Sequence, residues 1–169
     1  MTNIKMPKYK NKIIWIVLSI SIFLPNFVNA ESSLIVRPQV GYGYMDSSSL
    51  SNNGSINHVG LRILLNTGEN KRYGLEATRF HLNNAKSFGS LGIVLEQRLW
   101  NWFNMSIATI GYFNYKIGSK NPVGLMTNLG WEPNSYKNFK PFITYRNDII
   151  FSEDIDIVYS ISIGVTFVF

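Results

Sequence analysis

The two histidines are the first side chains to consider for chemistry, because the chain contains no cysteine. A zinc site at His58 or His81 would need carboxylates beside them, since zinc takes three or four protein ligands. No aspartate or glutamate stands at ligand spacing from either histidine. We therefore expect both to be rim residues at strand ends, flanking surface loops, and we expect no metal or other cofactor.

The segment Gly41-Tyr42-Gly43 is the nearest approach to a glycine-rich loop. A phosphate-binding loop needs a turn that follows a strand and opens a helix. Here the two glycines lie within an alternating strand pattern and no helical pattern follows, so we do not expect a nucleotide site.

Seven charged side chains are more informative, because they occupy the polar phase of an alternating pattern. They are Arg37, Arg62, Glu76, Glu96, Arg98, Arg146 and Asp148. Residues in one phase of a strand share one face, and a charge that is desolvated alone costs several kcal/mol. We expect these four cations and three anions to pair. The sequence leaves open whether Arg146 meets Glu76 or Glu96, and in the alternative interpretation the arginines line a small anion path.

The elements that position these charges are strands, because apolar and polar residues alternate in eight segments. The segments cover 34–44, 59–65, 73–78, 91–99, 104–115, 123–131, 143–148 and 155–169, with polar loops predicted at 46–57, 81–87, 116–122 and 152–154. The last segment is the clearest. Its apolar phase contains Tyr159, Ile161, Ile163, Val165, Phe167 and Phe169.

Two features favour a membrane barrel over a soluble β-sandwich. The polar phase is mostly glycine, serine, threonine and asparagine, which suits a narrow interior better than a solvated surface. Aromatic residues also form two bands, as the two bilayer interfaces select. One band comprises Trp100, Trp102, Phe103, Trp131, Tyr136 and Phe139, and the other comprises Tyr42, Tyr44, Phe113 and Tyr115.

The N-terminal 30 residues have the order of a secretory signal peptide. Four lysines precede an apolar run over 13–24, and Val28-Asn29-Ala30 is a cleavage pattern. A transmembrane helix is the rival interpretation, but 12 residues cover only about 18 Å of a roughly 30 Å core. We predict a signal peptide over 1–30 and one barrel domain over 31–169. Eight strands leave about 17 residues for each strand and its connection, and ten would be tight.

The net charge of +6 does not indicate a nucleic-acid partner. Lys5, Lys8, Lys10 and Lys12 all fall in the predicted signal peptide, which leaves 12 basic against 10 acidic residues. A surplus of two is too small for a polyanion-binding face.

With this export signal and terminal pattern, residues 31–169 resemble the small outer-membrane β-barrels of Gram-negative bacteria, of the outer membrane protein X and outer membrane protein A type. The resemblance implies an all-β, eight-stranded antiparallel up-and-down transmembrane barrel in the cell outer membrane. It implies that the terminal pattern ending at Phe169 is the signal presented to the barrel-assembly machinery. It also implies a monomer that contacts outer-membrane lipid and lipopolysaccharide.

Three functions follow for such a barrel. We expect a non-enzymatic protein with a lumen filled by ion-paired side chains, acting in envelope integrity or surface interaction through its loops, with a surface ligand that the sequence does not identify. The alternative is a barrel that conducts small solutes or ions. A lipid A deacylase is less well supported, since the stretch Tyr145-Arg146-Asn147-Asp148 lacks the base and nucleophile of that enzyme class.

Overall fold

The computed structural model describes residues 33–47, 53–67, 70–82, 87–115, 121–133, 138–153 and 155–169. The strands are β1 (Ser33–Ser47), β2 (Gly54–Asn66), β3 (Lys71–Leu82), β4 (Phe88–Arg98), β5 (Phe103–Phe113), β6 (Val123–Trp131), β7 (Phe139–Phe151) and β8 (Ile155–Val168). The predicted signal peptide, 1–30, lies outside these residues. No helix in the described ranges is long and apolar enough to cross a membrane.

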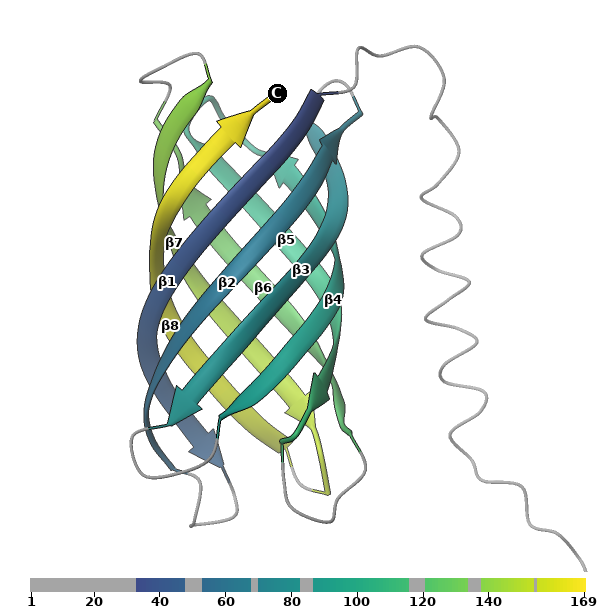
Figure 1. Cartoon of the computed structure of the whole chain (residues 1–169), viewed down its shortest axis with the longest axis vertical. Helices are drawn as coiled ribbons and strands as arrows, with labels where there is room; N and C mark the ends of the chain where they lie inside the picture. The colour runs from purple at the N-terminus through teal and green to yellow at the C-terminus, as the bar shows by residue number, and fades with distance from the viewer. Residues whose placement is uncertain are drawn as a thin grey trace, which may run out of the picture. The chain divides into compact units, whose positions relative to one another are not determined.

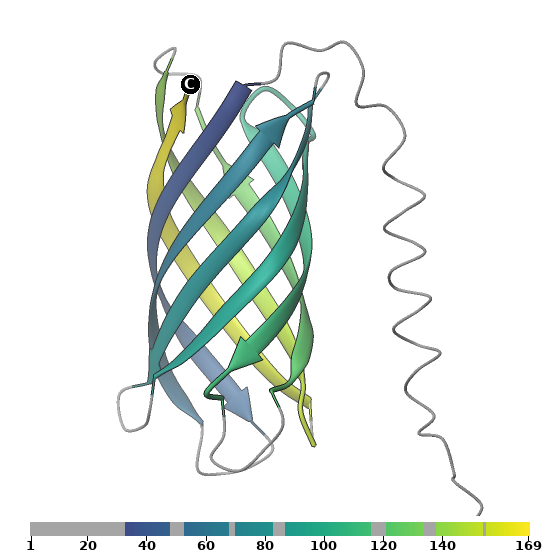
Figure 2. The ribbon, with the colours of Figure 1, turned by 45° about the vertical axis from the view of Figure 1, so that its right-hand side comes forward.

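The eight strands form one closed barrel. Each strand pairs antiparallel with the next, and β1 pairs with β8 to close the ring, so no strand edge is left open. Figures 1 and 2 show β1 starting and β8 ending at the same rim. The predicted eight-stranded up-and-down barrel is confirmed, and the sandwich and ten-stranded alternatives are wrong for the described part of the chain.

The phase of the strands is as predicted. Ile161 and Ile163 point outward and are 56% and 57% exposed, whereas Ser160 and Ser162 between and beside them are 3% and 1% exposed. The same alternation recurs in the other strands, so the outer wall is apolar and the polar phase fills the interior. Interior and exterior positions alternate in this way in every barrel strand.

The aromatic bands are largely as predicted, with one correction at Tyr115. Strand β5 ends at Phe113, and the next residue, Asn114, has a φ of 57°. This left-handed residue breaks the alternation, and Tyr115 packs edge-on against the buried ring of Phe88 at 4.9 Å. Tyr115 therefore belongs to the interior, not to the outer band; Tyr136 lies outside the described residues.

Two predicted loops are shorter in the structure. The polar stretch 46–57 was expected to be a loop, but β1 continues to Ser47 and β2 begins at Gly54. Likewise His81 and Leu82 belong to β3. Ladder hydrogen bonds come from the backbone, so serine, asparagine and glycine extend these strands without apolar side chains.

Candidate functional site: the charged interior of the barrel

All seven charges predicted to face inward do so. Their carboxylates and guanidinium groups are buried, apart from Arg98, whose side chain is 20% exposed. They come from five strands, β1, β2, β3, β4 and β7. The structure brings all of them into ion pairs, and two further charges join them.

Arg146 on β7 lies at the centre of one half of this network. Its guanidinium donates to both carboxylate oxygens of Asp148, at 2.6 and 2.9 Å, and it forms an ion pair with Glu76 on β3. It also donates to the Thr78 hydroxyl at 3.2 Å. Of the two glutamates that the sequence left open, Glu76 is the partner of Arg146. Because β3 and β7 are on opposite sides of an eight-stranded ring, this pair crosses the lumen.

Glu96 on β4 gathers three arginines. Its carboxylate lies 2.6 Å from Arg37, 2.7 Å from Arg72 and 3.3 Å from Arg62. Arg62 also donates to Glu76, at 2.7 Å from its Nε. Arg62 therefore links Glu96 to Glu76, and so connects this part of the network to Arg146.

Glu132 and Arg72 are further members of the network, beyond the seven predicted charges. Glu132 follows β6 and pairs with Arg37, with Arg98 at 3.1 Å and with Arg72 at 3.7 Å. Glu132 lies beyond the last apolar residue of the predicted segment 123–131, so the alternation within that segment does not include it. The signal was nevertheless present, since Glu132 continues the inward phase of Asn128 and Gly130, just as Arg72 shares the phase of Glu76.

Electrostatics keep Glu132 ionised at the rim. Burial opposes ionisation of its carboxyl group, but Arg37 and Arg72 outweigh burial, and the Thr166 hydroxyl donates to the same carboxylate at 2.8 Å. The pKa of Glu132 consequently lies below its usual value. The network is a ladder of ion pairs between five arginines and four carboxylates, and it runs from the rim holding the termini to Asp148.

The part of the lumen beyond Asp148 is apolar, which corrects the expectation of a polar interior throughout. The Phe80 ring stacks on Phe88 at 4.8 Å and lies 5.2 Å from the Arg146 guanidinium carbon. Tyr112 donates to Asp148 at 2.9 Å and joins these rings to the ion pairs. The apolar side chains packed around the rings include Met45, Ile56, Leu82, Ile110, Ile150 and Val158.

A small polar group closes the outer end of this apolar cluster. Asp156 is buried and accepts hydrogen bonds from Ser47 at 2.6 Å, Tyr115 at 2.7 Å and Ser152 at 3.0 Å. Burial and the Asp156 carboxylate raise the pKa of Tyr115, so its hydroxyl remains a donor. The strand ends are therefore tied together inside the rim opposite the termini.

His58 is not the rim residue that was expected. It is 4% exposed, faces the lumen from β2, and contacts Ser160 at 3.1 Å and Ser162 at 3.3 Å through Nε2. These serines belong to β8, so the imidazole passes over β1, which lies between the two strands. Gly41 on β1 provides the space for the imidazole, because a Cβ at this position would lie 2.2 Å from His58 Nε2. The glycine pair thus serves packing.

His81 does lie near a strand end, exposed, with Nδ1 2.8 Å from the Ser87 hydroxyl. In the described ranges, no group of three or more histidine, aspartate or glutamate side chains is arranged to hold a metal ion. The interior side chains occupy the lumen with paired charges and stacked aromatic rings.

The residues predicted to form the assembly signal lie along the outer face of β8 and just after it. Tyr159, Ile161 and Ile163 are exposed, and Val165 and Phe167 are half-buried. The backbone of Phe169 pairs with Leu34 of β1, at 2.9 and 3.1 Å, while its side chain is 75% exposed. The Phe169 side chain is therefore available to another molecule.

Comparison with solved structures supports the fold. Neisserial surface protein A superposes with a TM-score of 0.62 at 14% identity, over 82% of this chain and 99% of that one. A designed transmembrane β-barrel gives 0.49 at 12% identity, over 81% and 95%. The attachment invasion locus protein Ail of Yersinia pestis, in complex with the heparin analogue sucrose octasulfate, gives 0.48 at 10%, over 83% and 100%.

At these sequence identities the comparison shows similarity of fold alone, and this conclusion depends on Neisserial surface protein A. No protein-family model matches the sequence. No curated protein matches it either.

Proposed function

We propose that the chain is a non-enzymatic outer-membrane barrel whose filled lumen serves envelope integrity or surface interaction. The observation that carries the proposal is the continuous interior, in which the ion-pair ladder from Arg98 to Asp148 is followed by the Phe80 and Phe88 rings. An eight-stranded barrel is just wide enough for side chains to fill it. Such a barrel acts through its wall and its loops.

The outer wall supports placement in a membrane. Every strand exposes at least one large apolar side chain on this wall, and an exposed apolar area of this extent marks contact with lipid or protein. Tryptophans at the rim with the termini, such as Trp100 and Trp102, match an interfacial aromatic belt. A cleaved signal peptide over 1–30 would deliver the chain to the periplasm, and an even number of strands then leaves both ends on that side.

Strands β1, β3, β5 and β7 end at the opposite rim (Figure 1), and the predicted surface loops follow them in the sequence. In this proposal they face the outside and meet lipopolysaccharide, a host surface or another membrane protein. The barrel-assembly machinery would insert the chain through its terminal pattern ending at Phe169, and the protein would work as a monomer.

An enzymatic role has little support in the interior. His58 contacts Ser160, but both side chains face the lumen, 4% and 3% exposed. An ester-bearing lipid would have to enter the filled barrel to reach them. A histidine–serine pair alone also lacks the third group that orients the base.

Conductance through the refolded barrel in planar bilayers tests the proposal. We expect the wild-type protein to show no steady current, and Arg146→Ala to show brief openings more often because it removes the ion pair that crosses the lumen.

A separate measurement tests the predicted signal peptide: the N-terminal sequence of the protein from purified outer membranes should begin at Glu31. The conductance measurement also has a refuting outcome. A steady, ion-selective wild-type current that Arg146→Ala leaves unchanged would refute the filled lumen.

One observation favours the alternative, a conducting barrel. Gln39, Asn128 and Thr144 each place a buried polar atom in the interior without a hydrogen-bond partner among the described residues. Buried groups of this kind normally bind water. A hydrated route beside the ion pairs would explain a steady wild-type current.

A further inference from the structure

The outer wall of the barrel carries very few charges. The described strands have three exposed charged side chains, Asp46, Lys71 and Arg79. Asp46 is one residue from the end of β1 and Lys71 is the first residue of β3, so both lie at a rim. Arg79 is three residues inside the end of β3, which makes it the charge placed deepest on the apolar wall.

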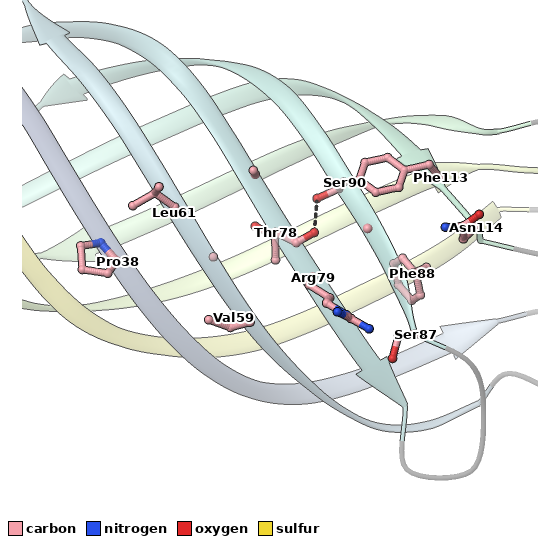
Figure 3. A pocket seen from close by; sticks show the side chains of 13 residues that line it. Pro38, Val59, Leu61, Thr78, Arg79, Ser87, Phe88, Ser90, Phe113 and Asn114 are labelled. Carbon is pink, nitrogen blue, oxygen red and sulfur yellow. Dashed lines mark hydrogen bonds between the residues drawn. The ribbon is translucent and has the colours of Figure 1, made fainter.

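Arg79 has no ion pair or hydrogen bond to any described residue, unlike the arginines of the interior. It lies in a groove of about 710 Å³ in the outer half of the wall, and Figure 3 shows it between Val59 and Ser87. A cation that is left unpaired on a lipid-facing wall is free to bind an anion from outside the chain.

The groove has small side chains where its neighbours are large. Pro38, Ala77 and Gly89 line it together with the larger Leu61 and Phe113, and exposed Ala77 forms part of its floor. A Cβ at Gly89 would lie 2.0 Å from the Phe113 ring, so the ring lies over that glycine. The result is a shallow apolar channel with a cation at one end. It complements an anionic lipid, which has an apolar chain and a negatively charged headgroup.

The depth of Arg79 suits a lipid headgroup. Three residues of a strand tilted by about 45° put it roughly 7 Å below the strand end. A cation on the lipid face costs little near the interface and much more at the midplane. Nearer the rim, His81 and Ser87 continue the polar end of the groove.

We propose that this groove binds a phosphorylated lipid of the outer leaflet, of the lipopolysaccharide type, with a phosphate on Arg79 and an acyl chain over Ala77, beside the Phe113 ring. The inference rests on the membrane placement proposed above. Guanidinium groups bind phosphate through paired, charge-assisted hydrogen bonds. The end of the barrel that holds Arg79 is the end that faces outward in that placement, where phosphorylated glycolipid is available.

The test is native mass spectrometry of the purified barrel in neutral detergent. The probe is a diphosphorylated glycolipid of the lipid A type, compared with the same lipid after removal of its phosphates. Arg79→Gln should weaken binding of the phosphorylated lipid about tenfold, because hydrogen bonds to a charged group are lost. Lys71→Gln is the matched control, an exposed cation on the same strand at the opposite rim, and it should leave binding unchanged.

A second variant tests the acyl channel independently of charge. Ala77→Phe fills the floor of the groove and should weaken binding of both forms of the lipid, while inorganic phosphate alone should not displace the lipid. Heat-modifiable gel mobility shows that each variant is folded.

Three results would overturn the proposal. These are equal binding of the two lipids, equal loss in Arg79→Gln and Lys71→Gln, and unchanged binding in Ala77→Phe. Displacement of the lipid by inorganic phosphate would assign Arg79 to the free ion instead. None of these results bears on the proposed filled lumen, because conductance measurements test that proposal separately. Cell fractionation tests the membrane placement, since it would detect a chain that is not in the outer membrane.

Discussion

Replacing Arg146 by alanine tests the interior network at its most buried point. The Arg146 side chain is fully buried and faces two carboxylates. After its removal Glu76 keeps Arg62, 2.7 Å away, whereas Asp148 keeps, among the described residues, only the Tyr112 hydroxyl at 2.9 Å. The uncompensated charge therefore falls mainly on Asp148. Breaking a buried pair in this way costs about 3–5 kcal/mol.

This division between the two carboxylates makes the prediction sharp. Arg146→Ala combined with Asp148→Asn should recover a large part of the lost stability, and Arg146→Ala combined with Glu76→Gln should recover less. Arg98→Ala is the matched control, because Arg98 lies at the rim and Glu132 keeps Arg37 after its loss. It should cost about 1 kcal/mol or less.

The assay is equilibrium unfolding in urea of barrels refolded into lipid vesicles, followed by tryptophan fluorescence and by heat-modifiable gel mobility. Double-mutant cycles then give the coupling energies. Equal costs for Arg146→Ala and Arg98→Ala, or no recovery on neutralising Asp148, would show that the buried pairs do not hold the barrel together as the geometry indicates.

Three further changes test other parts of the structure. Ile161→Arg should cost about 2–4 kcal/mol in the same unfolding assay and Ser162→Ala much less, because only Ile161 faces outward; equal costs would reverse the assigned phase. Phe169→Ser should leave the refolded barrel as stable as wild type, since that side chain is exposed, yet lower the folded protein in outer-membrane fractions of cells; normal levels would argue against a role in assembly. Gly41→Val should displace His58 from β8 and destabilise the barrel by roughly 1–3 kcal/mol; an unchanged unfolding midpoint and an unchanged His58 NMR shift would contradict that packing.

The strands and their facing could be predicted because side chains alternate with a period of two. Once Ile161 is placed outside, Ser162 must lie inside, and the inward position of Arg146 follows from the same rule. Closure into a ring brings charges from distant strands together without any sequence signal for a particular pair. The choice of Glu76 for Arg146 depends on stagger between strands, which fixes the height of each residue in the lumen.

The outer part of the lumen could not be predicted in this way because alternation fails there. In Ile149-Ile150-Phe151 both phases are apolar, so the pattern does not separate the wall from the interior. Ile150 is fully buried and Phe151 is exposed. His58 was misplaced for a related reason, since its strand continues through residues with low β-propensity that normally mark a loop.

The apolar cluster and the ion pairs occupy adjoining parts of the lumen. An ion pair is weak where water reaches it, because a high dielectric screens the attraction between the charges. The Phe80 and Phe88 rings lie on the outer side of Arg146 and exclude water from its pairs with Glu76 and Asp148. Conversely, the Arg146 guanidinium stabilises the position of the Phe80 ring through a cation–π contact. The two halves of the interior thus stabilise each other, and loss of Arg146 should loosen the ring cluster as well as the charges.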